Sequence, residues 1–240
     1  MALDAFARYT VEAQRRQVPR FAGRAVNFAG WVLRNLGAAD EAHARHLEAL
    51  ELGQHSEGIR ELTIAALEDL AEQFVQAGDP DGAQARLAEA RALLSGDLVF
   101  GWRLDLKHQL ICGRLALLLG DAGSALATAS ALESRAAALG VPRYVTTARV
   151  LTHRARRALS LPVDLDAVAA DLDRLEEAVA VEAWWWTGET AADLAVPAWL
   201  DLAADRAERL ARQAGEHAEV LRRAAAQRLD RWRARSAERI

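Results

Sequence analysis

Apolar positions recur along this chain with the period of an amphipathic α-helix, and short runs of turn-forming residues separate the segments that show this pattern. Ala, Leu, Arg and Glu, which all favour helices, dominate the composition, whereas Val and Ile are sparse. The pattern therefore predicts an all-α protein. Hydrophobic residues make up 52% and charged residues 27% of the 240 residues, as in ordinary soluble globular chains.

The turn signals recur at a nearly constant distance. They lie in the segments LRNLGAADEA, FVQAGDPDGA, ALLLGDAGSA and ALSLPVDLDA, and the residues that mark the turns are Gly37, Gly78, Gly120 and Pro162. The spacings between them are 41, 42 and 42 residues, with a helical segment on both sides of each turn. A repeat of this kind predicts a series of antiparallel helical hairpins.

Small residues keep a fixed distance from these turns. Seven residues before them lie Gly30, Ala71, Gly113 and Ala155, and five residues after them lie Ala42, Ala83, Ala125 and Ala167. Where two antiparallel helices cross closely, a side chain larger than a methyl group would force them apart. We therefore expect the two helices of each hairpin to meet at these positions.

The residues after the turns favour helix starts. Asp79 is the expected N-cap before Pro80 at the first helical position, and Asp40 and Asp164 are expected to cap their helices in the same way. The segments SGD (95–97) and LGVP (139–142) are expected to close the second and third hairpins.

The two ends of the chain depart from the repeat. We expect one continuous domain over 1–240, with an N-terminal capping helix in 1–18, four repeats of about 42 residues in 19–180, a shorter fifth repeat in 181–214 and a C-terminal capping helix in 216–236. The fifth repeat begins with EAWWWTGET, in which three tryptophans are consecutive. On a helix these three rings would sweep about 200° of the surface, so they cannot all face one simple core.

Charge and cysteine content narrow the function classes. The formal net charge of −4 argues against nucleic acid as the main partner. A single cysteine, Cys112, and the absence of a secretory signal fit a reducing cytoplasm. No window of the sequence is apolar enough to predict a membrane span.

The small–turn–small pattern resembles the tetratricopeptide repeat, and GRLALLLGDAGSA (113–125) matches it best. The period is longer than the 34 residues usual in that family, and the consensus aromatic residues are mostly missing. Long Ala-rich units of this kind resemble the C-terminal repeats of actinobacterial signal-transducing ATPase and LuxR-type regulators. The resemblance implies a right-handed α-solenoid of about five hairpins with a C-terminal capping helix. The chain either stands alone or is part of a longer regulator.

In tetratricopeptide arrays the first helix of each hairpin lines the concave groove. Carried over by distance from each turn, the resemblance implies a ligand-binding groove lined by Arg24, Asn27, Trp31, Arg34, Asn35, Glu72, Lys107, Arg114, Arg149 and Arg156. Arginine and asparagine around tryptophan suit the recognition of carboxylates. In the last repeat, Trp184 is expected at the groove or its rim, Trp185 against the preceding hairpin and Trp186 between the two helices of its own hairpin.

No catalytic signature stands out, because the chain has no phosphate-binding glycine loop and no nucleophile elbow. His43 and His46 lie three residues apart on one helix, which leaves a metal site as an alternative. Cys112 with His108 four residues earlier is a further alternative, as a nucleophile and its base. The acidic pairs Glu68–Asp69 and Glu176–Glu177 are expected on solvated faces.

The sequence thus predicts a non-catalytic protein without a cofactor or a metal. It would bind a protein, a peptide or a small effector in its groove, as a sensor or scaffold of a bacterial regulatory system. It is expected neither to bind nucleic acid directly nor to contact membranes. A structural scaffold that self-associates through exposed tryptophans remains the alternative from another class.

Overall fold

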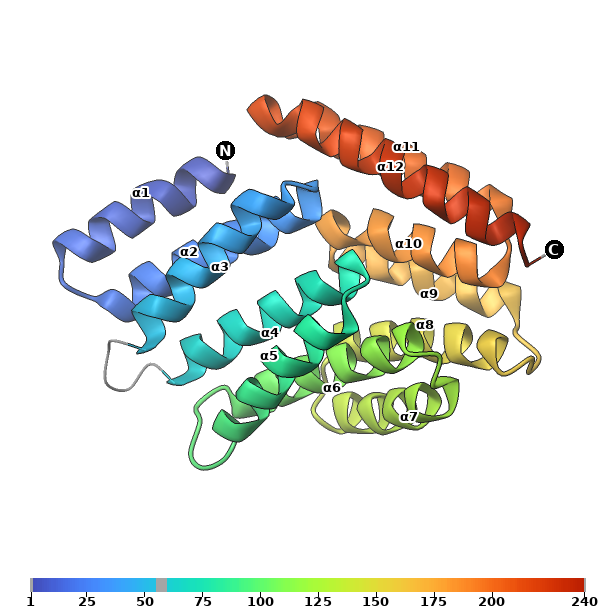
Figure 1. Cartoon of the computed structure of the whole chain (residues 1–240), viewed down its shortest axis with the longest axis horizontal. Coiled ribbons are helices and arrows are strands. Elements are labelled where there is room, and N and C mark those ends of the chain that lie inside the picture. Colours follow the sequence, from blue (N-terminus) through green and yellow to red (C-terminus); the bar gives the residue numbers. More distant parts are fainter. Residues whose placement is uncertain (1, 55–59, 240) are drawn as a thin grey trace. The chain divides into compact units, whose positions relative to one another are not determined.

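The computed structural model describes residues 2–54 and 60–239, and within these ranges the chain is all-α, as predicted, with no strand. The α-helices are α1 (Ala2–Arg15), α2 (Pro19–Leu36), α3 (Ala39–Gln54), α4 (Arg60–Ala77), α5 (Pro80–Leu93), α6 (Gly101–Leu118), α7 (Ala122–Ala138), α8 (Pro142–Ala158), α9 (Leu165–Ala178), α10 (Ala180–Leu194), α11 (Pro197–Gln213) and α12 (Ala218–Ala237) (Figure 1). A short 3₁₀ turn, Gly215–His217, precedes α12. None of the described helices combines the length and the apolar composition that a membrane span requires.

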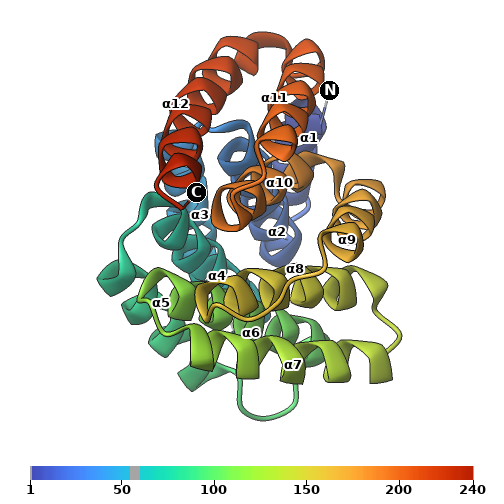
Figure 2. The same ribbon diagram turned by 90° about the vertical axis from the view of Figure 1, so that its right-hand side faces the viewer.

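The helices fall into two compact units. The first comprises the chain up to Arg34 together with Ala39–Leu118, and the second comprises Asn35–Ala38 and the chain from Leu119 onward. In the first unit α4 packs against α3, α5 and α6. In the second unit α7 packs along α8, and α10, α11 and α12 pack against one another (Figure 2). The prediction of one continuous array over the whole chain stays a prediction.

The predicted turns lie where the helices end. Gly37, Gly78 and Gly120 all adopt the left-handed backbone conformation, with φ of 92°, 79° and 79°, which glycine enters without a steric cost. The fourth turn differs, because Ser160 takes the left-handed conformation there, two residues before Pro162. The expected boundary between α8 and α9 is nevertheless confirmed.

Two of the three predicted helix caps are confirmed. The Asp79 carboxylate accepts from the Gly82 amide at 2.9 Å, and that of Asp164 accepts from two amides at the start of α9. Asp40 is not a cap, because α3 begins one residue earlier and Asp40 lies in its first turn. There it interacts with the helix dipole without closing the helix end.

The small residues lie at close helix approaches. All eight are buried except the half-buried Ala167. A Cβ added at Gly30 would lie 2.7 Å from the His46 ring, so no larger residue fits where α2 crosses α3. The small residues therefore set how closely the paired helices pack.

The three consecutive tryptophans are all buried. The Trp184 ring centroid lies 5.8 Å from that of Trp232 on α12, and the Trp184 indole N–H donates to the Asn35 carbonyl at 3.2 Å. Trp185 and Trp186 pack edge to face. The expectation that Trp184 faces a groove or its rim is wrong, because α12 covers its ring and itself needs an apolar surface to bury Trp232.

Gly188 on α10 makes room for the Trp232 ring. A Cβ at this position would lie 1.9 Å from Trp232 Cζ3, and the buried indole has little space to move. We expect Gly188→Ala to lower the free energy of unfolding by about 1–3 kcal/mol through overpacking. Chemical denaturation followed by circular dichroism measures this loss.

Gly123→Ala in α7 is the matched control, because among the described residues its added Cβ would meet only the carboxylate of the neighbouring Asp121, at an ordinary contact distance of 3.7 Å. Alanine is the better helix former, so this variant should gain up to about 1 kcal/mol. Equal stability of the two variants would show that α12 does not pack on Gly188 in solution.

Candidate functional site

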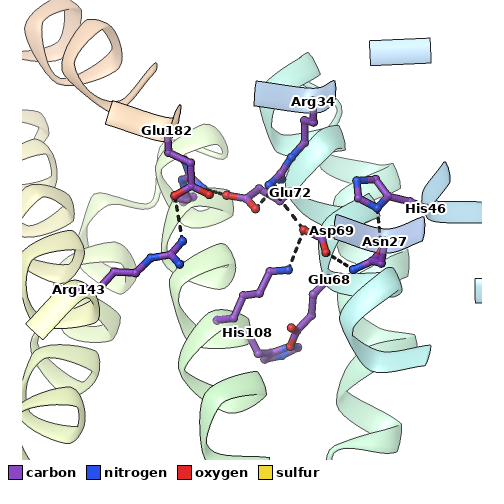
Figure 3. Close-up of polar contacts among 11 residues, drawn as sticks. Asn27, Arg34, His46, Glu68, Asp69, Glu72, His108, Arg143 and Glu182 are labelled. Atoms are coloured by element: carbon purple, nitrogen blue, oxygen red, sulfur yellow. Dashed lines mark hydrogen bonds and ion pairs between the residues drawn. The ribbon is translucent and has the colours of Figure 1, made fainter. Parts of the chain in front are cut away.

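A network of buried charged and polar side chains joins α2, α3, α4 and α6 in the first unit (Figure 3). Asn27 on α2 lies at its edge, where its side-chain N–H donates to the Asp69 carboxylate at 2.7 Å. The Asn27 oxygen lies 2.8 Å from His46 Nδ1. An amide oxygen only accepts hydrogen bonds, so in this arrangement His46 carries its proton on Nδ1. Burial lowers the pKa of His46 to about 4, which keeps the ring neutral at pH 7.

Ion pairs form the centre of the network. Glu72 on α4 pairs with Arg34 on α2 and with Arg114 on α6. Burial opposes the ionisation of Glu72, but the two guanidinium groups outweigh it and hold the pKa of its carboxyl well below the usual value. Asp69 is balanced in the same way by Lys107, whose Nζ lies 2.8 Å from its carboxylate. Both carboxylates are therefore charged and fixed in place.

The repeat explains which residues meet. Glu72 and Arg114 both lie six residues before the glycine of their turn, and they are 42 residues apart. Asn27 and Asp69 are also 42 residues apart. Side chains at the same repeat position (Glu72 and Arg114) or one position apart (Asn27 and Asp69) thus contact each other between successive first helices.

The second unit carries polar contacts of the same kind on its own helices. Arg143 on α8 donates to Glu182 on α10 at 3.0 Å. Arg149 on α8 donates to Glu133 on α7 at 2.7 Å. Arg156 at the end of α8 donates to the carbonyl of Pro162 at 2.9 Å. These cations are held by partners on neighbouring segments.

A second buried network links α8, α10 and α12. Glu189 on α10 accepts from the Trp232 indole N–H at 2.6 Å and from Arg235 at 2.7 Å, and Arg154 on α8 approaches it at 3.2 Å. Burial opposes ionisation here as well, but Arg154 and Arg235 lower the pKa of Glu189 to about 2. The network holds α12 by charge as well as by apolar packing.

The structure divides the predicted groove residues into two groups. Six are buried and less than 8% exposed, namely Asn27, Arg34, Asn35, Glu72, Arg114 and Trp184. The other five keep solvent exposure, and they are Arg24, Trp31, Lys107, Arg149 and Arg156. The expectation of an open polar face is therefore wrong for the first group, because most of those side chains are enclosed by neighbouring helices and engaged with other residues.

Sequence reasoning missed the roles of Asp69 and Glu189. The pair Glu68–Asp69 was expected on a solvated face, but both residues are buried. The available signal was the apolar surrounding sequence TIAALEDLAEQF, in which few positions can face water. Glu176 does keep solvent exposure, and its carboxylate pairs with Arg206 and Arg209.

The alternative chemistry finds little support in the described residues. The His43 ring packs against Phe74, whereas His46 contacts Asn27. No three His, Cys, Asp or Glu side chains in the described part of the chain are placed to hold a metal ion. Burial raises the pKa of the Cys112 thiol to about 11, and a protonated thiol is a poor nucleophile.

Comparison of the chain with known protein families, curated proteins and solved structures found no match.

Proposed function

We propose that the chain is a non-catalytic, tetratricopeptide-like binding module of a cytoplasmic regulatory system. Its fold would be a right-handed solenoid of about five hairpins closed by α12. The ligand would be an acidic peptide, an acidic protein segment or a small acidic effector, bound along the first helices of the hairpins. The proposal rests on the repeat at 41–42 residues and on the charges that remain accessible on those helices.

One observation carries the choice of an acidic ligand. Of the predicted groove residues, those that keep solvent exposure are four cations and one indole: Arg24, Lys107, Arg149, Arg156 and Trp31. The buried members include the carboxylate Glu72, which is already paired with Arg34 and Arg114. The groups that a ligand can reach on these helices therefore favour negative charge.

The buried network supports such a role through preorganisation. Lys107 is 21% exposed at its side chain and is held at Asp69, which in turn is fixed by Asn27. A cation that is already positioned loses little conformational entropy when a carboxylate binds beside it. Shallow contacts of this kind along successive helices add up to useful affinity.

Binding of fluorescent peptide libraries tests the proposal. We expect an acidic library to bind and a basic library of equal length to fail, with affinity that falls as salt screens the charges. Arg24→Gln and Arg149→Gln should each weaken binding several-fold. The ion pairs that Arg24 and Arg149 form with carboxylates are partly exposed, so each variant should lose no more than about 1 kcal/mol of unfolding free energy.

Arg223→Gln is the matched control, because this exposed arginine lies on α12 and not on a first helix of a hairpin. Its removal should leave peptide binding unchanged. Equal binding of acidic and basic libraries would contradict the proposal, as would equal losses in all three variants.

A self-associating scaffold is the second candidate function. Val99 is 80% exposed, and the nearby Phe100 and Trp102 are exposed as well, which is unusual for three large apolar residues so close in sequence. A molecular mass that rises with concentration in light scattering, without peptide selectivity, would favour this candidate.

A further inference from the structure

Glu68 on α4 is a fully buried carboxyl group without the partners that Asp69 and Glu72 have. Its side chain has no solvent exposure, and neither carboxyl oxygen has a hydrogen-bond partner within the described residues. His108 on α6 lies close by, with its Nδ1 3.8 Å from Glu68 Oε1 (Figure 3). That nitrogen is buried and likewise has no hydrogen-bond partner there.

The surroundings of this pair disfavour a negative charge on Glu68. The charged and titratable groups that act on the pair are Asp69 and Glu72 on α4, Asp105, Lys107 and Cys112 on α6, and Arg91 on α5. His46 on α3 and Arg34 on α2 act on the adjacent Asp69. Lys107, Arg34 and Arg114 already pair with Asp69 and Glu72. A third carboxylate one residue from Asp69 and four from Glu72 would add repulsion in a buried site.

These surroundings favour the neutral form of both members of the pair. Burial raises the pKa of Glu68 well above its usual value; Lys107 opposes this shift, and the carboxylates nearby add to it. Burial and Arg91 lower the pKa of His108. The carboxyl proton of Glu68 thus lies between α4 and α6, within a short side-chain movement of His108 Nδ1.

We propose that Glu68 and His108 form a proton-binding pair that links the packing of α4 on α6 to pH. With the proton bound, the interface carries no unpaired charge at Glu68, and the two helices pack closely. When the proton leaves to solvent, a buried carboxylate remains between the helices, and their packing loosens. The inference does not depend on the binding function proposed above.

The sign of the linkage follows from the direction of the shift. The folded chain binds the Glu68 proton more tightly than the unfolded chain does, so stability falls as the pH rises from the unfolded pKa towards the folded one. His46 and His108 act in the opposite sense, because their pKa values are lowered in the folded chain. They therefore remove stability as the pH falls below the usual pKa of histidine. Above the usual pKa of histidine, the two histidines no longer offset the contribution of Glu68 to the slope of stability against pH.

The variant Glu68→Gln mimics the protonated carboxyl and cannot ionise. We expect the unfolding constant of the wild type relative to this variant to rise about tenfold per pH unit above the unfolded pKa of glutamate, until the folded pKa is reached. Chemical denaturation between pH 5 and 9 measures this ratio. Glu89→Gln on α5, an exposed carboxylate paired with Arg86, should show a ratio that does not change with pH.

Infrared spectroscopy and amide exchange test the pair directly in the intact chain. The wild type at pH 7 should show the carbonyl stretching band of a buried protonated carboxyl, and Glu68→Gln should lack it. Amides of α4 and α6 in the wild type should exchange faster at high pH than intrinsic rates explain. A constant stability ratio across the pH range, or the absence of the protonated band, would overturn the proposal. If Glu68→Gln fails to fold, the wild-type band and its loss with rising pH remain decisive.

Discussion

Replacing Arg34 by alanine is expected to lower the free energy of unfolding by about 3–5 kcal/mol, because the change leaves buried carboxylates without a counter-charge. Arg34 is 1% exposed, and its guanidinium pairs with Glu72 and approaches Asp69 at 3.6 Å. Arg114 and Lys107 remain in the variant, but each already serves one of these carboxylates. Urea denaturation at pH 7 measures the loss.

Arg24→Ala on the same helix is the matched control. Arg24 pairs with Glu61 at 3.2 Å, but more than a third of its side chain is exposed, so its loss should change stability by about 1 kcal/mol or less. A second comparison combines Arg34→Ala and Glu72→Gln in one double variant. Its loss of unfolding free energy should be smaller than the sum of the losses in the two single variants. If Arg34→Ala keeps full stability and only weakens ligand capture, the side chain is open to solvent and the sequence-based groove is right for this residue.

The features that sequence could predict are those fixed by local physics. A left-handed backbone favours glycine at Gly37, Gly78 and Gly120, and an aspartate before a proline favours a helix start at Asp79. Close helix crossings exclude large side chains, which makes the small residues near each turn recognisable. Because all of these constraints act within a few residues of the turn, the helix boundaries at these turns can be predicted from the amino-acid sequence alone.

The burial of charge could not be predicted in the same way. Asp69 and Glu72 resemble the solvated acids of any amphipathic helix, and their partners lie about 35–42 residues away in sequence. A buried carboxylate is stable only where partners converge on it, and that convergence is a property of packed helices. The repeat did contain a usable signal, since Glu72 and Arg114 occupy the same position in successive units.

Trp184 shows the same limit for apolar residues. The helical period correctly indicated that three adjacent rings need more than one packing surface. It could not indicate which surface each ring meets, because that depends on a helix that begins more than thirty residues later. In the structure the partner is α12, whose Trp232 packs on Trp184 and fits against Gly188.

Replacing Glu189 by alanine is expected to lower the free energy of unfolding by about 3–5 kcal/mol and to free α12 first. The Glu189 carboxylate is the common acceptor of Arg154 on α8 and of Trp232 and Arg235 on α12. Its loss leaves an indole N–H and two guanidinium groups with fewer acceptors in a buried site. Asp193 keeps part of the charge balance, since it pairs with Arg154 and lies 3.6 Å from Arg235. Amide exchange should therefore rise in α12 before it rises in α7.

The pH dependence distinguishes this network from simple packing. Glu189 has a pKa of about 2 in the folded chain against 4.5 for the ordinary group, so its stabilisation is complete above about pH 5 and disappears as the pH falls through the folded value. The wild type should lose stability more steeply than Glu189→Gln between about pH 5 and pH 2, and the two curves should converge in acid. Glu219→Gln on α12, an exposed carboxylate paired with Arg222, should follow the wild-type curve. Parallel curves for the wild type and Glu189→Gln would mean that α12 is retained by the apolar contacts of Trp232, Leu221 and Leu229 rather than by Glu189.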